Sequence, residues 1–107
     1  MNLLDKKCVP CEGGAEPLSE RDAKAFLTHA PGWTLDKAAM ISREFTFKDF
    51  VEAMKFVNRV AEIAESEGHH PNIHIFYNRI RLDLFTHAIN GLSENDFIVA
   101  AKINALG

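Results

Sequence analysis

The sequence lacks any run of eighteen apolar residues, so it contains no candidate for a membrane-spanning helix. It also lacks an excess of positive charge, because the formal net charge is −3 and the basic residues are scattered among acids. Binding to nucleic acid requires a basic face, so this balance argues against a nucleic-acid partner. The first residues do not follow the charged-then-apolar pattern of an export signal, and we expect a soluble, cytoplasmic protein.

Cysteine is scarce, and the only two, Cys8 and Cys11, have the C-x-x-C spacing of redox motifs and of half a zinc site. No second pair follows, and the surrounding glycines and prolines are typical of a loose segment. We therefore expect residues 1–17 to form a flexible N-terminal tail in which this pair is incidental or binds metal weakly. Residues 18–107 are long enough for a single domain with one core.

Three helices are predicted from positions where Ser or Thr is followed three residues later by an acid, a pattern that caps helix N-termini. These positions are residues 19–22, 46–49 and 93–96. The first helix should run from about residue 21 to about residue 29, and the second should end near Gly68. In the second helix, spacings of three and four predict one buried stripe formed by Phe47, Phe50, Val51, Met54, Val57, Ala61 and Ala64.

Between these helices the apolar residues alternate, which predicts two hairpins. The first pairs residues 33–36 with 40–46, and the second pairs residues 73–77 with 80–84 around a tight turn at Asn78-Arg79. The predicted class is α+β, a four-stranded antiparallel sheet with three helices packed on one face in the order α-β-β-α-β-β-α. The opposite face carries Arg79, Arg81, Asp83 and Phe85, and we interpret it as a candidate assembly surface.

Four of the five histidines lie in the segment from residue 67 to residue 87. His69 and His70 follow the long helix, and His87 lies near the end of the second hairpin. Pairing around Asn78-Arg79 would place Pro71 beside Thr86, so we expect these three imidazoles to converge at one end of the sheet. His74 should lie further away.

A cluster of three histidines has three interpretations. Zinc binding is one, although the spacing matches no common zinc signature and no thiolate or carboxylate obviously completes a ligand set. Surface histidines without a chemical role are another. Acid–base catalysis fits better, because imidazole can both give and take a proton near neutral pH.

The polar residues of this region, in order and spacing, resemble the signature of the pterin-4a-carbinolamine dehydratases. The matching positions are Glu65, His69, His70, Pro71, Tyr77, His87 and Asp96. Further similar positions run from Gly32-Trp33 to residues 91–94, so the resemblance covers residue 18 to the C-terminus. The sequence departs from the family pattern at Gly68, Ile73 and Phe85, which bear on the shape of the pocket.

The resemblance implies a cofactor-free and metal-free enzyme with three helices on one face of a four-stranded antiparallel sheet, assembled as a homodimer or homotetramer. The implied reaction removes water from 4a-hydroxytetrahydropterin, the carbinolamine produced when an aromatic amino acid hydroxylase uses its pterin. The product is quinonoid dihydropterin. The pterin substrate and a functional link to such a hydroxylase are therefore the expected partners.

The same resemblance implies roles for individual residues. His69, His70 and His87 become the catalytic trio, with His70 and His87 the most important. Glu65 and the backbone of Phe85 and Thr86 become substrate-binding positions, and Glu65 can also orient an imidazole. Pro71, Tyr77 and Asp96 are signature positions, and for Asp96 a structural role as a helix cap explains the residue fully.

Three alternatives remain open on the sequence. Relatives of this family act as dimerisation cofactors of a homeodomain transcription factor, so the chain could be a protein-binding module. It could also be a structural domain with a relict active site. A metal-dependent enzyme is the third.

Overall fold

The computed structural model describes residues 3–8, 16–37 and 39–106. Its helices are α1 (Glu20–Leu27), α2 (Phe50–Glu67) and α3 (Glu94–Asn104), and its short 3₁₀ turns are η1 (Leu3–Asp5) and η2 (His87–Ile89). Its strands are β1 (Thr34–Asp36), β2 (Met40–Thr46), β3 (Asn72–Phe76) and β4 (Arg79–Leu84). They form one antiparallel sheet in the order β1-β2-β4-β3. The expected α+β class and order of elements are confirmed.

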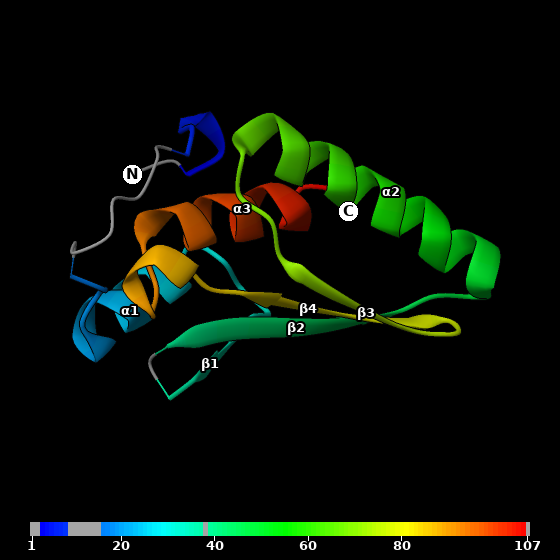
Figure 1. Ribbon diagram of the computed structural model, residues 1–107. Coiled ribbons are helices and arrows are strands. Elements are labelled where there is room, and N and C mark those ends of the chain that lie inside the picture. The colour runs from blue at the N-terminus through cyan, green and yellow to red at the C-terminus, as the bar shows by residue number, and fades with distance from the viewer. Residues whose placement is uncertain (1–2, 9–15, 38, 107) are drawn as a thin grey trace.

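The helical layer lies on one side of this sheet, where Figure 1 shows α2 and α3 crossing above the strands. The most enclosed helix is α3, which is buried along nearly its whole length. Its Phe97 is fully buried and stacks on Phe26 of α1 with ring centroids 5.4 Å apart. On the sheet side the core is closed by Ile41, Ile80, Leu82 and Leu84, all 0 % exposed. Within the residues described, no helix is both long and apolar enough to cross a membrane.

Two of the three predicted helix caps are confirmed. The Ser19 hydroxyl accepts a hydrogen bond from the Asp22 N–H at 3.1 Å, and Ser93 and Asp96 form a capping box at the start of α3. The cap predicted for α2 is wrong by three residues, because the helix begins at Phe50 with Asp49 as its N-cap.

The backbone of Phe47 explains the later start of α2. Its N–H donates to the Asn78 carbonyl at 2.8 Å, and its carbonyl accepts from the Asn78 side chain at 3.0 Å. These two bonds hold the residue after β2 against the β3–β4 turn. Asp49 is then the first residue able to cap the helix, and its Oδ1 accepts from the Glu52 N–H at 2.9 Å.

The stripe predicted for α2 is confirmed at Ala64, Phe47 and Val57, which are buried or pack on the core, but it is wrong at the start of the helix. The fully buried residues of the helix are Ala53, Val60 and Ala64, whereas Phe50 and Val51 are 45 % and 59 % exposed. Small side chains on the inner face allow α2 to lie close to its neighbours. Phe50 instead stacks on Tyr77 of the β3–β4 turn, with ring centroids 6.3 Å apart.

The second hairpin turns one residue earlier than predicted. Phe76 pairs with Arg79, so the turn is Tyr77-Asn78, and Tyr77 has the positive φ of 55°. Continuing this register places Pro71 opposite Leu84 rather than opposite Thr86. The predicted and observed pairings differ by two residues, which leaves every side chain on its expected face because strand side chains alternate with a period of two.

The N-terminal segment that the structure describes, Leu3–Cys8, packs on the domain although it was expected within a flexible tail at 1–17. Leu3 is 3 % exposed and belongs to the core, and the Lys6 ammonium lies 2.7 Å from the Glu94 carboxylate. In Figure 1 this segment passes beside the C-terminal end of α2 and over α3. It therefore covers the region where the histidine-bearing loop leaves α2.

Candidate active site

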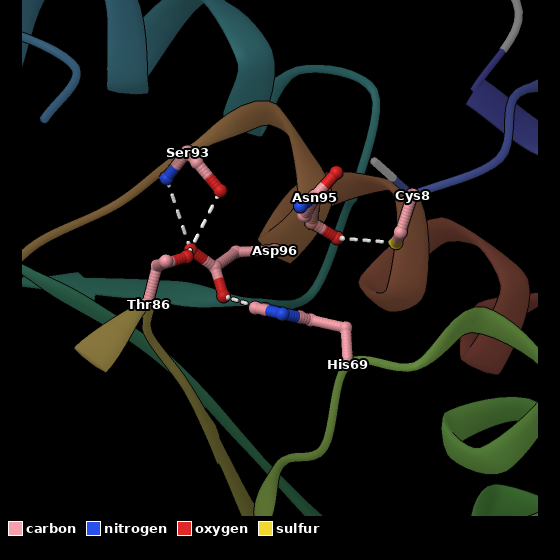
Figure 2. A network of polar contacts seen from close by, with 6 residues as sticks. All are labelled: Cys8, His69, Thr86, Ser93, Asn95 and Asp96. Carbon is pink, nitrogen blue, oxygen red and sulfur yellow. Dashed lines mark hydrogen bonds and ion pairs between the residues drawn. The ribbon is translucent and has the colours of Figure 1, made fainter. Parts of the chain in front are cut away.

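The loop carrying the paired histidines begins where α2 ends. Gly68 caps the helix in the left-handed conformation with φ of 64°, a region that glycine adopts without strain. The chain then reverses direction, and His69 extends toward the first turn of α3, as Figure 2 shows. Gly68, one of the positions where the sequence departs from the family pattern, is thus suited to ending the helix.

His69 is held by Asp96. Its Nε2 lies 2.6 Å from Oδ1 of Asp96, and the two side chains are 12 % and 0 % exposed. The other carboxylate oxygen, Oδ2, accepts from the Thr86 hydroxyl at 2.9 Å and from the Ser93 N–H at 3.0 Å. In the neutral tautomer whose Nε2–H donates to the Asp96 carboxylate, the Nδ1 of His69 bears a lone pair. The carboxylate fixes both the orientation and the tautomer of this imidazole.

His70 lies on the exposed side of the loop. Its Nε2 is 3.3 Å from Oε2 of Glu65, and the side chains are 59 % and 78 % exposed. Such an exposed contact contributes little to stability, so it guides the imidazole rather than locking it. The expected proximity of Glu65 to one of the histidines is present.

His87 opens the turn η2 directly after β4. Its ring packs against Phe85, with ring centroids 4.3 Å apart. The intervening Thr86 uses its backbone internally, because its N–H donates to the Gly91 carbonyl at 2.7 Å and its carbonyl accepts from the N–H groups of Gly91 and Ile89. The Thr86 backbone, expected to offer part of a strand edge to the substrate, thus makes these hydrogen bonds within its own turn.

The polar contacts of His69 lead towards the segment that carries His87 but do not include the His87 ring. Asp96 connects His69 with Thr86, the residue immediately before His87. His70 neighbours His69 in sequence and contacts Glu65 instead. Across the part of the chain that is described, no group of three or more His, Cys, Asp or Glu side chains is arranged to hold a metal ion.

Two other signature residues lie away from this network. Pro71 is the half-buried residue before β3, and Tyr77, 67 % exposed, sits in the turn at the opposite end of the hairpin. The contact of Tyr77 with Phe50 is consistent with packing of that turn against α2.

His74 lies apart from the candidate site, as expected, on the sheet face opposite the helices. Its Nε2 is 2.8 Å from Oδ2 of Asp83, which also accepts from Ser42 and Arg81. Burial alone would raise the pKa of Asp83, but the three donors outweigh burial and hold this pKa below its ordinary value. On the same face, a hollow of about 460 Å³ is lined by Gly32, Thr34, Ser42, Arg43, Glu44 and Arg81.

Sequence reasoning missed the pairing of His69 with Asp96 and a second network beside it. Glu67 accepts from the Lys102 ammonium at 2.6 Å and from the Cys8 N–H at 2.9 Å. The spacing of Val60, Ala64 and Glu67 puts this acid on the buried face of α2, which is a signal that the sequence does contain.

The Cys8 thiol is part of this second network, and its Sγ contacts the Asn95 carbonyl at 3.6 Å (Figure 2). Burial, assisted by the negative charge of Glu67, raises the pKa of Cys8 to about 12. Because the thiolate is the reactive form, this environment suppresses thiol chemistry at neutral pH. Cys11, the other half of the C-x-x-C pair, lies outside the described residues.

Comparison with known proteins places these features in a family. Residues 16–106 match the family model described as pterin 4 alpha carbinolamine dehydratase. A relative from Halorhodospira halophila, provisionally named a pterin-4-alpha-carbinolamine dehydratase, is 51 % identical over 100 % of this chain and 99 % of its own. A relative of the same provisional name from Methylococcus capsulatus is 47 % identical over 98 % of this chain and 93 % of its own.

Solved structures agree with the sequence relatives. A transcriptional coactivator/pterin dehydratase from Brucella melitensis superposes with a TM-score of 0.79 at 37 % identity, covering 85 % of this chain and 98 % of that one. A pterin dehydratase-like protein described as a RuBisCO assembly factor in the alpha-carboxysome gives a TM-score of 0.61 at 26 % identity, covering 73 % of this chain and 92 % of that one. The chain therefore belongs to the pterin 4 alpha carbinolamine dehydratase family.

Proposed function

We propose that the protein dehydrates 4a-hydroxytetrahydropterin to quinonoid dihydropterin by histidine acid–base catalysis. The observation that carries the proposal is the His69–Asp96 pair, joined through Thr86 to the position of His87, in a chain of this family. A carboxylate-bound imidazole in the same chain segment as two exposed imidazoles is suited to proton transfer.

The reaction needs one acid and one base. The base removes the proton from the pterin N5, whose electron pair forms the C4a=N5 double bond while the C4a–O bond breaks. The acid gives a proton to the departing hydroxyl, which leaves as water. One proton is taken and one is returned, so the enzyme ends in its original total protonation state and no oxidant, reductant or cofactor is consumed.

The three imidazoles divide these tasks in our proposal. His70 and His87 are solvent-exposed and exchange protons with the substrate. His69 is fixed by Asp96, and its Nδ1 accepts a hydrogen bond from the pterin that strengthens as the substrate approaches the transition state. Glu65 orients His70. The backbone of Phe85 offers hydrogen-bond donors and acceptors to the pterin, next to Thr86, whose own backbone groups bond to Gly91.

The wider setting follows from the same proposal. The enzyme would return the pterin used by an aromatic amino acid hydroxylase to a form that can be reduced again. It would do so in the cytoplasm as a homodimer or homotetramer, without a bound metal.

The test is dehydration of freshly generated 4a-hydroxytetrahydropterin, followed by absorbance. General acid–base groups typically contribute about a hundred- to ten-thousand-fold to a rate. We expect His70→Ala and His87→Ala each to lose at least a hundred-fold in kcat. His74→Ala is the matched control, because it removes a histidine from the opposite face of the sheet, and its turnover should match wild type.

Folded wild-type protein that is no faster than buffer would contradict this proposal. That result would favour the protein-binding alternative, which the coactivator and assembly-factor descriptions of the two solved relatives make concrete. Retained turnover in both histidine variants would instead preserve the activity and reject the assigned catalytic residues.

A further inference from the structure

Glu67 is an enclosed carboxylate that the proposed reaction does not use. Its side chain is 4 % exposed, and each of its oxygens has a partner from a different part of the chain. Oε2 lies 2.6 Å from the ammonium of Lys102 on α3, and Oε1 accepts from the Cys8 backbone N–H at 2.9 Å. One carboxylate thus ties together the N-terminal segment, α2 and α3.

The position of Glu67 makes these ties relevant to the site. It is the last residue of α2, and only Gly68 separates it from His69. Lys102 belongs to the same helix as Asp96, the partner of His69. The Cys8 thiol also contacts the carbonyl of Asn95, the residue before Asp96 (Figure 2). Both ends of the His69–Asp96 bond are therefore braced by neighbouring contacts.

Helix stability alone does not account for this arrangement. A carboxylate in the last turn of a helix faces the negative end of the helix dipole, which is unfavourable. A charged pair removed from water also costs desolvation free energy and is seldom a net source of stability. The ammonium of Lys102, against the opposing effect of burial, keeps the pKa of Glu67 below its ordinary value, so the carboxylate is ionised at neutral pH.

We propose that Glu67 and Lys102, together with the Cys8 N–H, are positioning groups that hold the His69-bearing loop in register with Asp96. The catalytic consequence of this inference rests on the proposed dehydratase function. The geometric consequence does not, because it concerns only the bond between His69 and Asp96. Displacement of a catalytic group by about 1 Å can cost on the order of a hundred-fold in rate.

The experiment compares four variants with wild type. Lys102→Met leaves Glu67 without its counter-ion, and Lys102→Arg keeps the charge. Glu67→Gln combined with Lys102→Met removes both charges, so no unpaired carboxylate remains to unfold the protein. Lys24→Met is the matched control, because Lys24 pairs with Glu20 on α1 at 3.3 Å with both side chains 64 % exposed.

Two quantities are measured for each variant. The first is kcat and KM for 4a-hydroxytetrahydropterin. The second is the NMR signal of the His69 Nε2 proton, which is protected from exchange while it is bonded to Asp96. We expect Lys102→Met and the double variant to lose about ten- to a hundred-fold in kcat with little change in KM. Both should lose protection of the His69 proton, whereas Lys102→Arg and Lys24→Met should retain it.

A folded double variant with wild-type kcat and a protected His69 proton would overturn the inference and leave the pair a purely structural tie. If wild type fails to dehydrate the pterin, the NMR comparison still tests whether Glu67 and Lys102 position His69. Loss of the protected proton in the double variant would then support the positioning role of Glu67 and Lys102, although the proposed dehydratase function would be rejected. Retention of the proton would overturn the positioning role as well.

Discussion

At the scale of single residues, Asp96 has two roles. It is the acid of the capping box that starts α3, and it is also the partner of His69. Its carboxylate receives hydrogen bonds from His69, Thr86 and Ser93 while being fully excluded from solvent. A buried carboxylate with donors on both oxygens is rigid, and this rigidity is passed to the imidazole.

Replacing Asp96 by asparagine should weaken both its contact with His69 and its capping of α3. An amide has only one acceptor oxygen, so it cannot accept from His69 and from the other two donors with the same geometry. We expect kcat to fall by about a hundred-fold and the unfolding free energy to fall by about 1–3 kcal/mol. Steady-state kinetics and urea unfolding measure the two effects.

The control for Asp96→Asn is Ser19→Ala, which removes the hydroxyl that caps α1 and bonds to Asp22. Loss of that cap should cost about 1 kcal/mol of unfolding free energy and leave kcat unchanged. Equal kcat in Asp96→Asn and wild type would reject a catalytic role for the His69–Asp96 bond.

The residues of the candidate site were only partly predictable. The dense run of histidines marks the region, and the spacing of the signature residues selects His69, His70 and His87 for the trio, whose roles stay predictions until tested. The partner of His69 was not predictable, because local capping explains Asp96 without any contact to a residue 27 positions away. The Glu67–Lys102 pair spans 35 positions and shares this difficulty.

At the scale of elements, cap patterns and periodicity predicted the three α-helices and both hairpins that the structure describes. The start of α2 and the register of the second hairpin depend on long-range contacts. The start of α2 and the β3–β4 turn are both set by the two bonds between Phe47 and Asn78. At the start of α2 the buried face was misassigned, because Phe50 and Val51 are more apolar than Ala53, which faces inward. Local hydrophobicity does not show which of two adjacent faces of a helix is buried when that choice depends on how closely the helix packs against its neighbours.

The corrected start of α2 leads to a direct test. Asp49→Ala removes the side chain that caps the helix, so the unfolding free energy should fall by about 1 kcal/mol. Thr46→Ala, at the position predicted from the sequence, lies at the end of β2 and should change it by less than about 0.5 kcal/mol. Urea unfolding measures the loss of unfolding free energy in each variant. A larger loss in Thr46→Ala than in Asp49→Ala would contradict the assignment of Asp49 as the N-cap.

At the scale of the whole molecule, two enclosed carboxylates link stability to acid. Asp83 ties β4 to β2 and β3, and Glu67 ties α2 to α3 and to the N-terminal segment. The pKa of each is lower in the folded protein than its ordinary value. Each therefore contributes stability that is fully present above the unfolded pKa of about 4 and is lost as pH falls through the lower folded pKa.

Acid unfolding should reveal this contribution. We expect the unfolding free energy of wild type to decline as pH falls from about 5 to about 3, and Asp83→Asn to show a shallower decline in that window. At pH 7 the same variant should be less stable by about 1–3 kcal/mol, because its donors lose a charged acceptor. Urea unfolding at a series of pH values measures both effects.

Glu62, an exposed acid of α2, provides the control substitution Glu62→Gln. A decline as steep in Asp83→Asn as in wild type would show that Asp83 is not among the groups that drive acid unfolding.

The order of strands in the sheet also constrains how the chain folds. The two central strands, β2 and β4, pair Ile41 with Leu84 although α2 and β3 lie between them in sequence. Each hairpin can close locally on a microsecond timescale, but the centre of the sheet forms only after a long loop has been closed. The His69–Asp96 bond in addition requires α3 to dock against the loop after α2, a contact between residues 27 positions apart. Recovery of catalytic activity during refolding should therefore trail the recovery of secondary structure.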